Sequence, residues 1–281
     1  MSLRRLLTLA CAACAGCSVL TSLDGLSSGG ADDAGADAST PVEAGEQDAE
    51  GVAEVDAGAT DAGPDVPPPK RFCETVDPGV VMCEDFDDGQ SGARWTPRVK
   101  PPGVSVGVVP GAGSLLQLVA ELGEPSTGNR WASFLRQLPG TVGHLRWSYD
   151  VMLMSRPMSG ASEVNNVRLV APTGTFDIYL EITPTLTRLQ EQRYLTAAPG
   201  EGGDIVDVDL EIGKWTRLGI EATVDGPDKR VKVLQDGKLI ADKALVYPLA
   251  GAPELQAGFS WGTGGAKAEV KTDNLVFEVL P

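Results

Sequence analysis

The feature of this sequence that most restricts its fold is the alternation of apolar and polar residues in short runs after residue 80. The clearest run spans residues 143–153, where every second position is apolar. Its apolar members are Leu145, Trp147, Tyr149, Val151 and Leu153. Because side chains of a β-strand point alternately to its two faces, this run predicts a strand with one buried face. Glycine and proline break the runs and no amphipathic helix is evident, so the sequence predicts an all-β antiparallel sandwich or barrel.

Further strands and one hairpin follow from the same pattern. Residues 176–182 and 217–224 alternate in the same way, and residues 230–241 contain Asp236-Gly237 between two apolar runs. Both of these turn residues tolerate positive φ, so the segment predicts a β-hairpin with a two-residue turn.

The material for a hydrophobic core is confined to the C-terminal part of the chain. All 15 aromatic residues lie at or beyond Phe72, whereas residues 18–70 carry 12 acidic side chains, one basic side chain and recurring Asp-Ala-Gly units. Low hydrophobicity and like charges predict a disordered tether over residues 17–70, with an r.m.s. span of roughly 40 Å. Calcium binding by the acidic repeats is an alternative, but the repeats lack fixed spacing. The folded domain is predicted over residues 71–281.

The N-terminus has the pattern of a secretory signal. Two arginines precede a short apolar run at residues 6–13, which is too short to span a bilayer, and the small residues Ala15 and Gly16 follow. The small pair before Cys17 resembles the lipobox of bacterial lipoproteins, in which the cysteine becomes the acylated first residue of the mature chain. This resemblance implies a signal peptide of residues 1–16 and a lipid anchor on Cys17.

Two alternatives stay open at this end of the chain. Cys11 or Cys14 could compete as the modified residue, or the segment could be an ordinary signal peptide with stray cysteines. Ser18 stands where inner-membrane lipoproteins carry aspartate, so the resemblance implies export to the cell envelope, at the outer membrane.

Removal of the signal and acylation of Cys17 leave two cysteines, Cys73 and Cys83. In an oxidising compartment this pair predicts a disulfide, which would stabilise the fold by roughly 2.5–3 kcal/mol. Alternatively, the two cysteines could supply half of the ligands of a metal site. A four-ligand zinc site would need further soft ligands, however, and His144 is the only histidine.

Charge and motif content exclude several function classes. The formal net charge of −16 disfavours nucleic acid as a partner, and no glycine-rich phosphate loop precedes a helix. A Ser-His-Asp device would have to use His144 with Ser148 and Asp150. Residues two apart on one strand are about 6.8 Å apart, beyond hydrogen-bond reach, so the sequence predicts no triad.

Three segments carry a resemblance to a known family. Residues 72–89, 213–237 and 272–277 resemble the first, late-middle and last strands of concanavalin A-like lectin/glucanase domains of the laminin-G-like type. The resemblance spans nearly all of residues 72–281 and implies a two-sheet jelly-roll sandwich. Members include sugar-binding lectins, polysaccharide hydrolases and lyases, and adhesion modules without catalysis, so the fold leaves the function open.

The resemblance also directs attention to three sets of residues. Glucanase relatives carry Glu-x-Asp-x-Glu along a strand, and the nearest match is Asp207, Asp209 and Glu211, whose first acid is one methylene too short. If the first and last strands are neighbours, a calcium site could form from Asp85, Asp87, Asp88, Asp273 and Asn274, although turn-forming and solvated roles are the alternative. Sugar-binding relatives use a concave sheet, which Arg146, Arg168, Tyr179, Arg188 and Gln190 could line.

These observations favour an envelope-anchored, non-catalytic binding or adhesion module for glycans or another envelope component. A divergent glycoside hydrolase or polysaccharide lyase on the same fold is the first alternative, and a structural envelope protein without a small ligand is the second. No cofactor is expected apart from a structural calcium ion.

Overall fold

A computed structural model describes residues 71–281 except 78–79, 101–102, 112–114, 125–127, 197 and 264–266. The predicted signal peptide, Cys17 and the predicted tether lie outside the described residues. Within the described part, no helix is long and apolar enough to cross a membrane.

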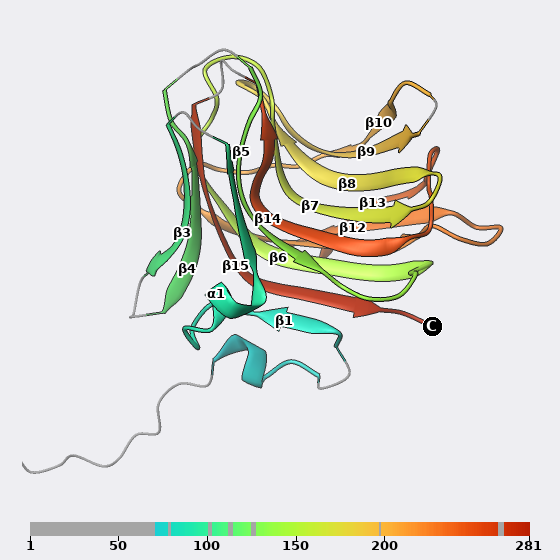
Figure 1. The fold of residues 1–281 in the computed structure, drawn as a ribbon, viewed down its shortest axis with the longest axis horizontal. Helices are drawn as coiled ribbons and strands as arrows, with labels where there is room; N and C mark the ends of the chain where they lie inside the picture. Colours follow the sequence, from blue (N-terminus) through green and yellow to red (C-terminus); the bar gives the residue numbers. More distant parts are fainter. Residues whose placement is uncertain are drawn as a thin grey trace, which may run out of the picture. The chain divides into compact units, whose positions relative to one another are not determined.

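The described chain forms two antiparallel β-sheets (Figure 1). The first sheet runs in the order β13 (Lys238–Ala244), β12 (Arg230–Gln235), β11 (Trp215–Thr223), β6 (His144–Ser155), β15 (Ala268–Val279), β4 (Leu116–Leu122) and β3 (Val104–Pro110), and β1 (Met82–Glu84) also pairs with β15. The second sheet runs β10 (Glu201–Asp207), β9 (Thr187–Leu195), β8 (Gly174–Ile182), β7 (Ser162–Ala171), β14 (Ala252–Gly262), β5 (Arg130–Gln137) and β2 (Thr96–Lys100). Two short helical turns, η1 (Phe72–Glu74) and α1 (Ser91–Arg94), complete the described elements. The predicted two-sheet jelly-roll sandwich is confirmed.

The core lies between the sheets and follows the predicted alternation. On β6 the residues Leu145, Trp147, Tyr149, Val151 and Leu153 are all buried, while the residues between them are partly exposed. The Trp147 ring packs against Tyr149 and Phe277, with ring centroids 5.6 and 6.4 Å away. Aromatic burial of this kind dominates the energetics of a core.

The hairpin between β12 and β13 is also confirmed. Asp236 and Gly237 have φ of 50° and 79°, so the two-residue turn places both residues in the left-handed region. This geometry matches the twist of the flanking strands, which is why the Asp-Gly pair identifies it from sequence.

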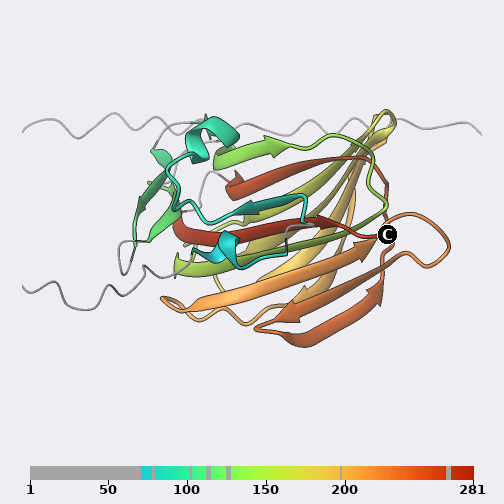
Figure 2. The ribbon, with the colours of Figure 1, turned by 90° about the horizontal axis from the view of Figure 1, so that it is seen from below.

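The first and last segments of the domain are neighbours, as expected from the resemblance. Met82–Glu84 pairs with Leu275–Phe277 on β15, and Figure 2 shows the cyan β1 beside the red β15. Among the described residues of the segment 72–89, these three alone are strand, and the predicted disulfide between Cys73 and Cys83 is present.

Two opposing bulges bend the second sheet. The register shifts between Val164 and Val167 on β7 and between Gln256 and Phe259 on β14. At this point the buried Asn165 has φ of 49°, and its Oδ1 accepts hydrogen bonds from Gly258 N (2.9 Å) and Thr272 Oγ1 (3.1 Å). Bulges kink a strand and increase its twist, and β14 curves along its length in Figure 1.

Candidate functional site

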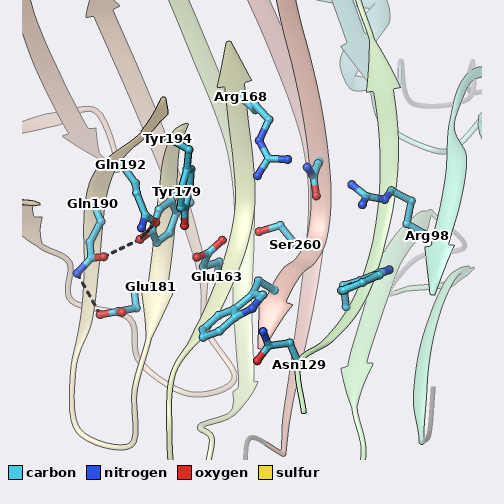
Figure 3. A pocket seen from close by; sticks show the side chains of 13 residues that line it. Arg98, Asn129, Glu163, Arg168, Tyr179, Glu181, Gln190, Gln192, Tyr194 and Ser260 are labelled. Atoms are coloured by element: carbon cyan, nitrogen blue, oxygen red, sulfur yellow. Dashed lines mark hydrogen bonds between the residues drawn. The ribbon is translucent and has the colours of Figure 1, made fainter. Parts of the chain in front are cut away.

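A groove of about 650 Å³ lies on the face of the second sheet that points away from the core. Figure 3 shows its polar side chains, which come from strands far apart in the sequence. The groove is lined by Arg98, Asn129, Trp131, Glu163, Arg168, Tyr179, Glu181, Gln190, Gln192, Tyr194, Gln256, Ser260 and Trp261.

Cross-strand register explains why these residues meet. Glu163 on β7 lies opposite Trp261 on β14 and Glu181 on β8. In a neighbouring row, Tyr179 on β8 lies opposite Gln190 on β9. On β7 and β8 the alternating residues Val164, Ile178 and Leu180 are buried in the core, so alternation along these strands builds the sandwich and the groove together.

A buried ion pair forms part of the groove floor. Arg168 Nε donates to Asp177 Oδ1 at 2.7 Å, and Asn166 Nδ2 donates to the same oxygen at 3.1 Å. Burial raises the pKa of the Asp177 carboxyl, and Arg168 partly opposes this shift. Glu254 is a second acid, with a carboxylate oxygen 3.5 Å from Arg168 Nη1. A buried charge held by several partners has a fixed orientation.

Three acceptors at or beneath the groove floor have no protein donor among the described residues. Asn166 Oδ1, Asp177 Oδ2 and Gln256 Oε1 are buried and have no hydrogen-bond partner among the described residues. Gln256 is 1% exposed and lines the groove. Because a buried acceptor without a donor costs free energy, the amide oxygen of Gln256 favours a ligand in the groove that brings hydroxyl or amide donors.

Glu163 is a groove-lining acid whose titration is altered by its surroundings. Burial raises the pKa of Glu163 to about 7, and Asp177 and Glu181 add to the shift, whereas Arg168 opposes it. Near neutral pH the Glu163 carboxyl therefore exists in both protonation states, and its protonated form can donate a hydrogen bond.

Tyr179 fixes the amides at the other side of the groove. Its hydroxyl lies 2.8 Å from Gln190 Oε1 and 3.0 Å from Gln192 Oε1. Burial raises the pKa of the Tyr179 hydroxyl, so it stays protonated and acts as a donor rather than a base. Gln190 Nε2 in turn donates to Asp204 at 2.8 Å, which sets the orientation of that amide.

Three further aromatic side chains, Trp131, Trp261 and Tyr194, line the groove. Sequence reasoning placed only Tyr179 on this face. Trp261 follows the β14 bulge, where the register shifts again between Phe259 and Trp261, so simple alternation along the strand does not show which way it points. Tyr194 is 43% exposed, which leaves much of its ring available for contact.

The structure brings together most of the residues predicted to bind a ligand. Arg168, Tyr179 and Gln190 line the groove. Arg188 lies beside it and forms ion pairs with Glu181 and Asp204, both at 2.7 Å.

Arg146 does not belong to this set. It lies on β6 in the other sheet, where its guanidinium pairs with Glu221 at 3.0 Å and with Glu278 at 3.2 Å. Its placement on the same concave face was wrong, because alternation assigns a residue to a face of its strand but does not assign the strand to a sheet.

The candidate catalytic acids Asp207, Asp209 and Glu211 are exposed, and Val208 and Leu210 between them are buried. The period of two therefore holds, but β10 ends at Asp207 and none of the three acids lines the groove. Glu211 instead pairs with Lys214 at 2.8 Å. The three side chains share a face that is directed to solvent.

The candidate calcium ligands lie near one another at the junction of β1 and β15. Asp85 accepts hydrogen bonds from Cys73 N and Asp87 N, and Asp88 pairs with Arg94 at 2.8 Å. Burial raises the pKa of Asp273 to about 7, and Asp87, Asp150 and Asp85 contribute to this shift.

Asn274 donates from Nδ2 to Asp150. Among the described residues, no group of three or more His, Cys, Asp or Glu side chains is arranged to hold a metal ion. Calcium binding stays a prediction from the sequence.

Comparison with known proteins identifies the fold. No family model matches the chain, and no curated protein matches it. Among solved structures, the cellulose-induced protein Cip1 aligns with a TM-score of 0.52 and 13% identity over 71% of this chain and 97% of its own.

The alginate lyase vAL-1 from Chlorella virus aligns with a TM-score of 0.51 and 11% identity over 72% of this chain and 100% of its own. At these identities the likeness shows the jelly-roll fold alone.

Proposed function

We propose that the protein is a glycan-binding module and that the groove on the second sheet is its binding site. The observation that carries the proposal is the combination in one open groove of aromatic faces with fixed polar groups. Aromatic rings cover the apolar faces of sugar rings, and oriented amides and carboxyls bond to their hydroxyl groups. Gln256 Oε1, which lines the groove and has no donor among the described residues, favours a ligand rich in hydroxyl donors.

Binding of purified full-length protein to a panel of neutral and charged oligosaccharides tests this proposal. Trp261→Ala and Tyr194→Ala should each weaken binding about tenfold, equivalent to roughly 1.4 kcal/mol. Trp215→Ala is the matched control, because Trp215 is 37% exposed and lies on β11 in the other sheet. Failure to retain any glycan, or equal losses in all three variants, would contradict the proposal.

The module is proposed to work at the cell envelope, anchored through acylated Cys17 and a flexible spacer. A signal-like N-terminus, a lipobox-like cysteine and an acidic, apolar-poor segment support this placement. Metabolic labelling with a fatty acid tests it: label should enter the wild-type protein and not Cys17→Ser. Label that persists in Cys17→Ser and disappears in Cys14→Ser would move the anchor to the neighbouring cysteine.

A second candidate function, a glycan-cleaving enzyme, is favoured by the Glu163 and Glu181 pair. The two acids lie directly opposite on adjacent strands, and glycosidases of the retaining type hold two carboxyls about 5–5.5 Å apart. A carboxyl whose pKa is raised to about 7 suits a general acid at neutral pH.

Release of reducing ends from a polysaccharide panel tests the enzymatic function. Glu163→Gln should abolish product while retaining binding, and Asp209→Asn, outside the groove, should leave product formation unchanged. A wild-type protein that binds glycans without releasing any product would contradict this second candidate and leave the binding module in place.

A further inference from the structure

One end of the groove carries positive charge that the surrounding acids do not neutralise. Arg98 and Lys100 lie on β2, the edge strand of the second sheet, and Trp131 lies on the neighbouring β5 opposite Lys100. Lys100 Nζ is 4.6 Å from the centroid of the Trp131 ring, and Arg98 Cζ is 5.8 Å from it. Figure 3 shows Arg98 at one side of the groove and Gln190 and Glu181 at the other.

The acids near this end are already shared. The closest carboxylate to Arg98 is that of Glu254, with an N–O distance of 4.0 Å, and the same Oε1 atom lies 3.5 Å from Arg168 Nη1. Gln256 Nε2 also donates to that atom at 3.0 Å. In the part of the chain that the structure describes, Lys100 forms no ion pair, and its ammonium lies over the Trp131 ring. Of Arg98 and Lys100, only Arg98 therefore approaches a carboxylate, and it shares that carboxylate with Arg168.

Beside the opposite end of the groove, acidic side chains outnumber basic ones. Arg188 pairs there with both Glu181 and Asp204, and Asp207 lies opposite Arg188 in the sheet. The sign of the charge beside the groove thus changes from its β2 end to its β9 end. In a chain with a net charge of −16, an uncompensated pair of cations beside a groove is a specific local feature.

We propose that the β2 end of the groove is a subsite for a negatively charged substituent of the bound glycan, a carboxylate or a sulfate, recognised by Arg98 and Lys100. The Trp131 ring holds the two cations at the groove wall through cation–π contacts. The guanidinium of Arg98 offers a planar pair of donors, and Lys100 adds a point charge beside it. This inference rests on the proposed glycan-binding function and names the class of glycan that the groove selects.

The test compares an acidic glycan with its neutral ester on the same backbone, and with a sulfated glycan of similar length. Affinities of the full-length protein are measured by calorimetry for an oligogalacturonate, its neutral methyl ester and a sulfated oligosaccharide of similar length. We expect the oligogalacturonate to bind about tenfold more tightly than its ester in low salt, with the difference shrinking as salt screens the charges. Preference for the uronate over the sulfated ligand would identify the carboxylate as the recognised anion, and the reverse preference would identify the sulfate.

The variant Arg98→Gln/Lys100→Gln should remove the preference for charged ligands, so that the oligogalacturonate and its neutral ester bind this variant with equal affinity. Arg230→Gln/Lys232→Gln is the control, because it removes the same charge from β12 in the other sheet. Equal affinity for all charged and neutral ligands would overturn the subsite, as would a preference that survives in the β2 variant; the two cations would then serve only to protect the sheet edge. Absence of binding to every glycan would overturn the proposed function itself.

Discussion

Replacing Glu163 with glutamine should change how the stability of the domain depends on pH. The carboxyl has a pKa raised to about 7 in the folded protein, mainly by burial, against 4.5 for the ordinary side chain. The folded state therefore binds the proton more tightly than the unfolded state. Its contribution to stability is complete below pH 4.5 and is lost as pH rises through about 7.

The magnitude follows from the two pKa values. Raising the pKa of the Glu163 carboxyl from 4.5 to about 7 corresponds to about 3.4 kcal/mol of unfolding free energy. The side chain borders an open groove and is only partly buried, so solvent screening reduces the expected effect to about 1–2 kcal/mol. Glutamine has the same shape as glutamate and cannot titrate, so Glu163→Gln should not show this decrease in unfolding free energy as pH rises.

Urea denaturation at pH 5, 6, 7 and 8 measures the effect. Between pH 5 and 8 the wild-type protein should lose about 1–2 kcal/mol more unfolding free energy than Glu163→Gln. Asp273→Asn provides a second measurement, because the pKa of Asp273 is also raised to about 7, at a separate site. The changes in pH-dependent unfolding free energy caused by the two substitutions should add in the double variant. Parallel pH profiles for wild type and Glu163→Gln would refute the reasoning about the groove.

Three further predictions concern the scaffold and are measured by denaturation at constant pH. Asn165→Ala should cost about 2–4 kcal/mol, because it leaves Gly258 N and Thr272 Oγ1 without their acceptor; a loss under 1 kcal/mol would contradict that role. Gly258→Ala should cost about 2–3 kcal/mol, since φ is 93° and the new Cβ would lie 2.7 Å from Ala132 O, whereas Gly226→Ala, with open space around it, should cost less. Cys73→Ser/Cys83→Ser should cost about 2.5–3 kcal/mol, and a reductant should lower wild-type stability equally without affecting the variant.

Features that depend on local sequence were predictable. Alternation on β6 fixes which side chains face the core, and Asp236-Gly237 fixes a hairpin through the backbone freedom of its two residues. The pairing of Cys73 with Cys83, which the structure shows, was predicted because they are the two cysteines that remain if residues 1–16 are a signal peptide and Cys17 is acylated. Each of these inferences needs only residues that are adjacent or of one rare type.

The candidate site depended on information that local sequence does not contain. The alternation on β8 predicted Asp177 as a residue opposite the core, but not that it would be 1% exposed beneath Arg168. Trp131 and Trp261 were not assigned to the groove, because pairing across β5, β14 and β7 decides their position and the bulges shift that pairing. Arg146 was misplaced for the related reason that sheet membership is a long-range property.

The bulges on β7 and β14 link local strand geometry to the long-range packing of the two sheets. Asn165 bonds with Gly258 on the neighbouring strand and with Thr272 on the opposite sheet, so one buried amide ties the curvature of β7 and β14 to the packing of the sandwich. The groove residues Glu163 and Trp261 lie immediately beyond these two bulges. A change at Asn165 should therefore alter the spacing of the groove side chains as well as the stability of the core, although Asn165 itself is fully buried and does not line the groove. Ligand affinity and core stability should thus decline together in variants of this residue, whereas in variants of Trp261 affinity should decline alone.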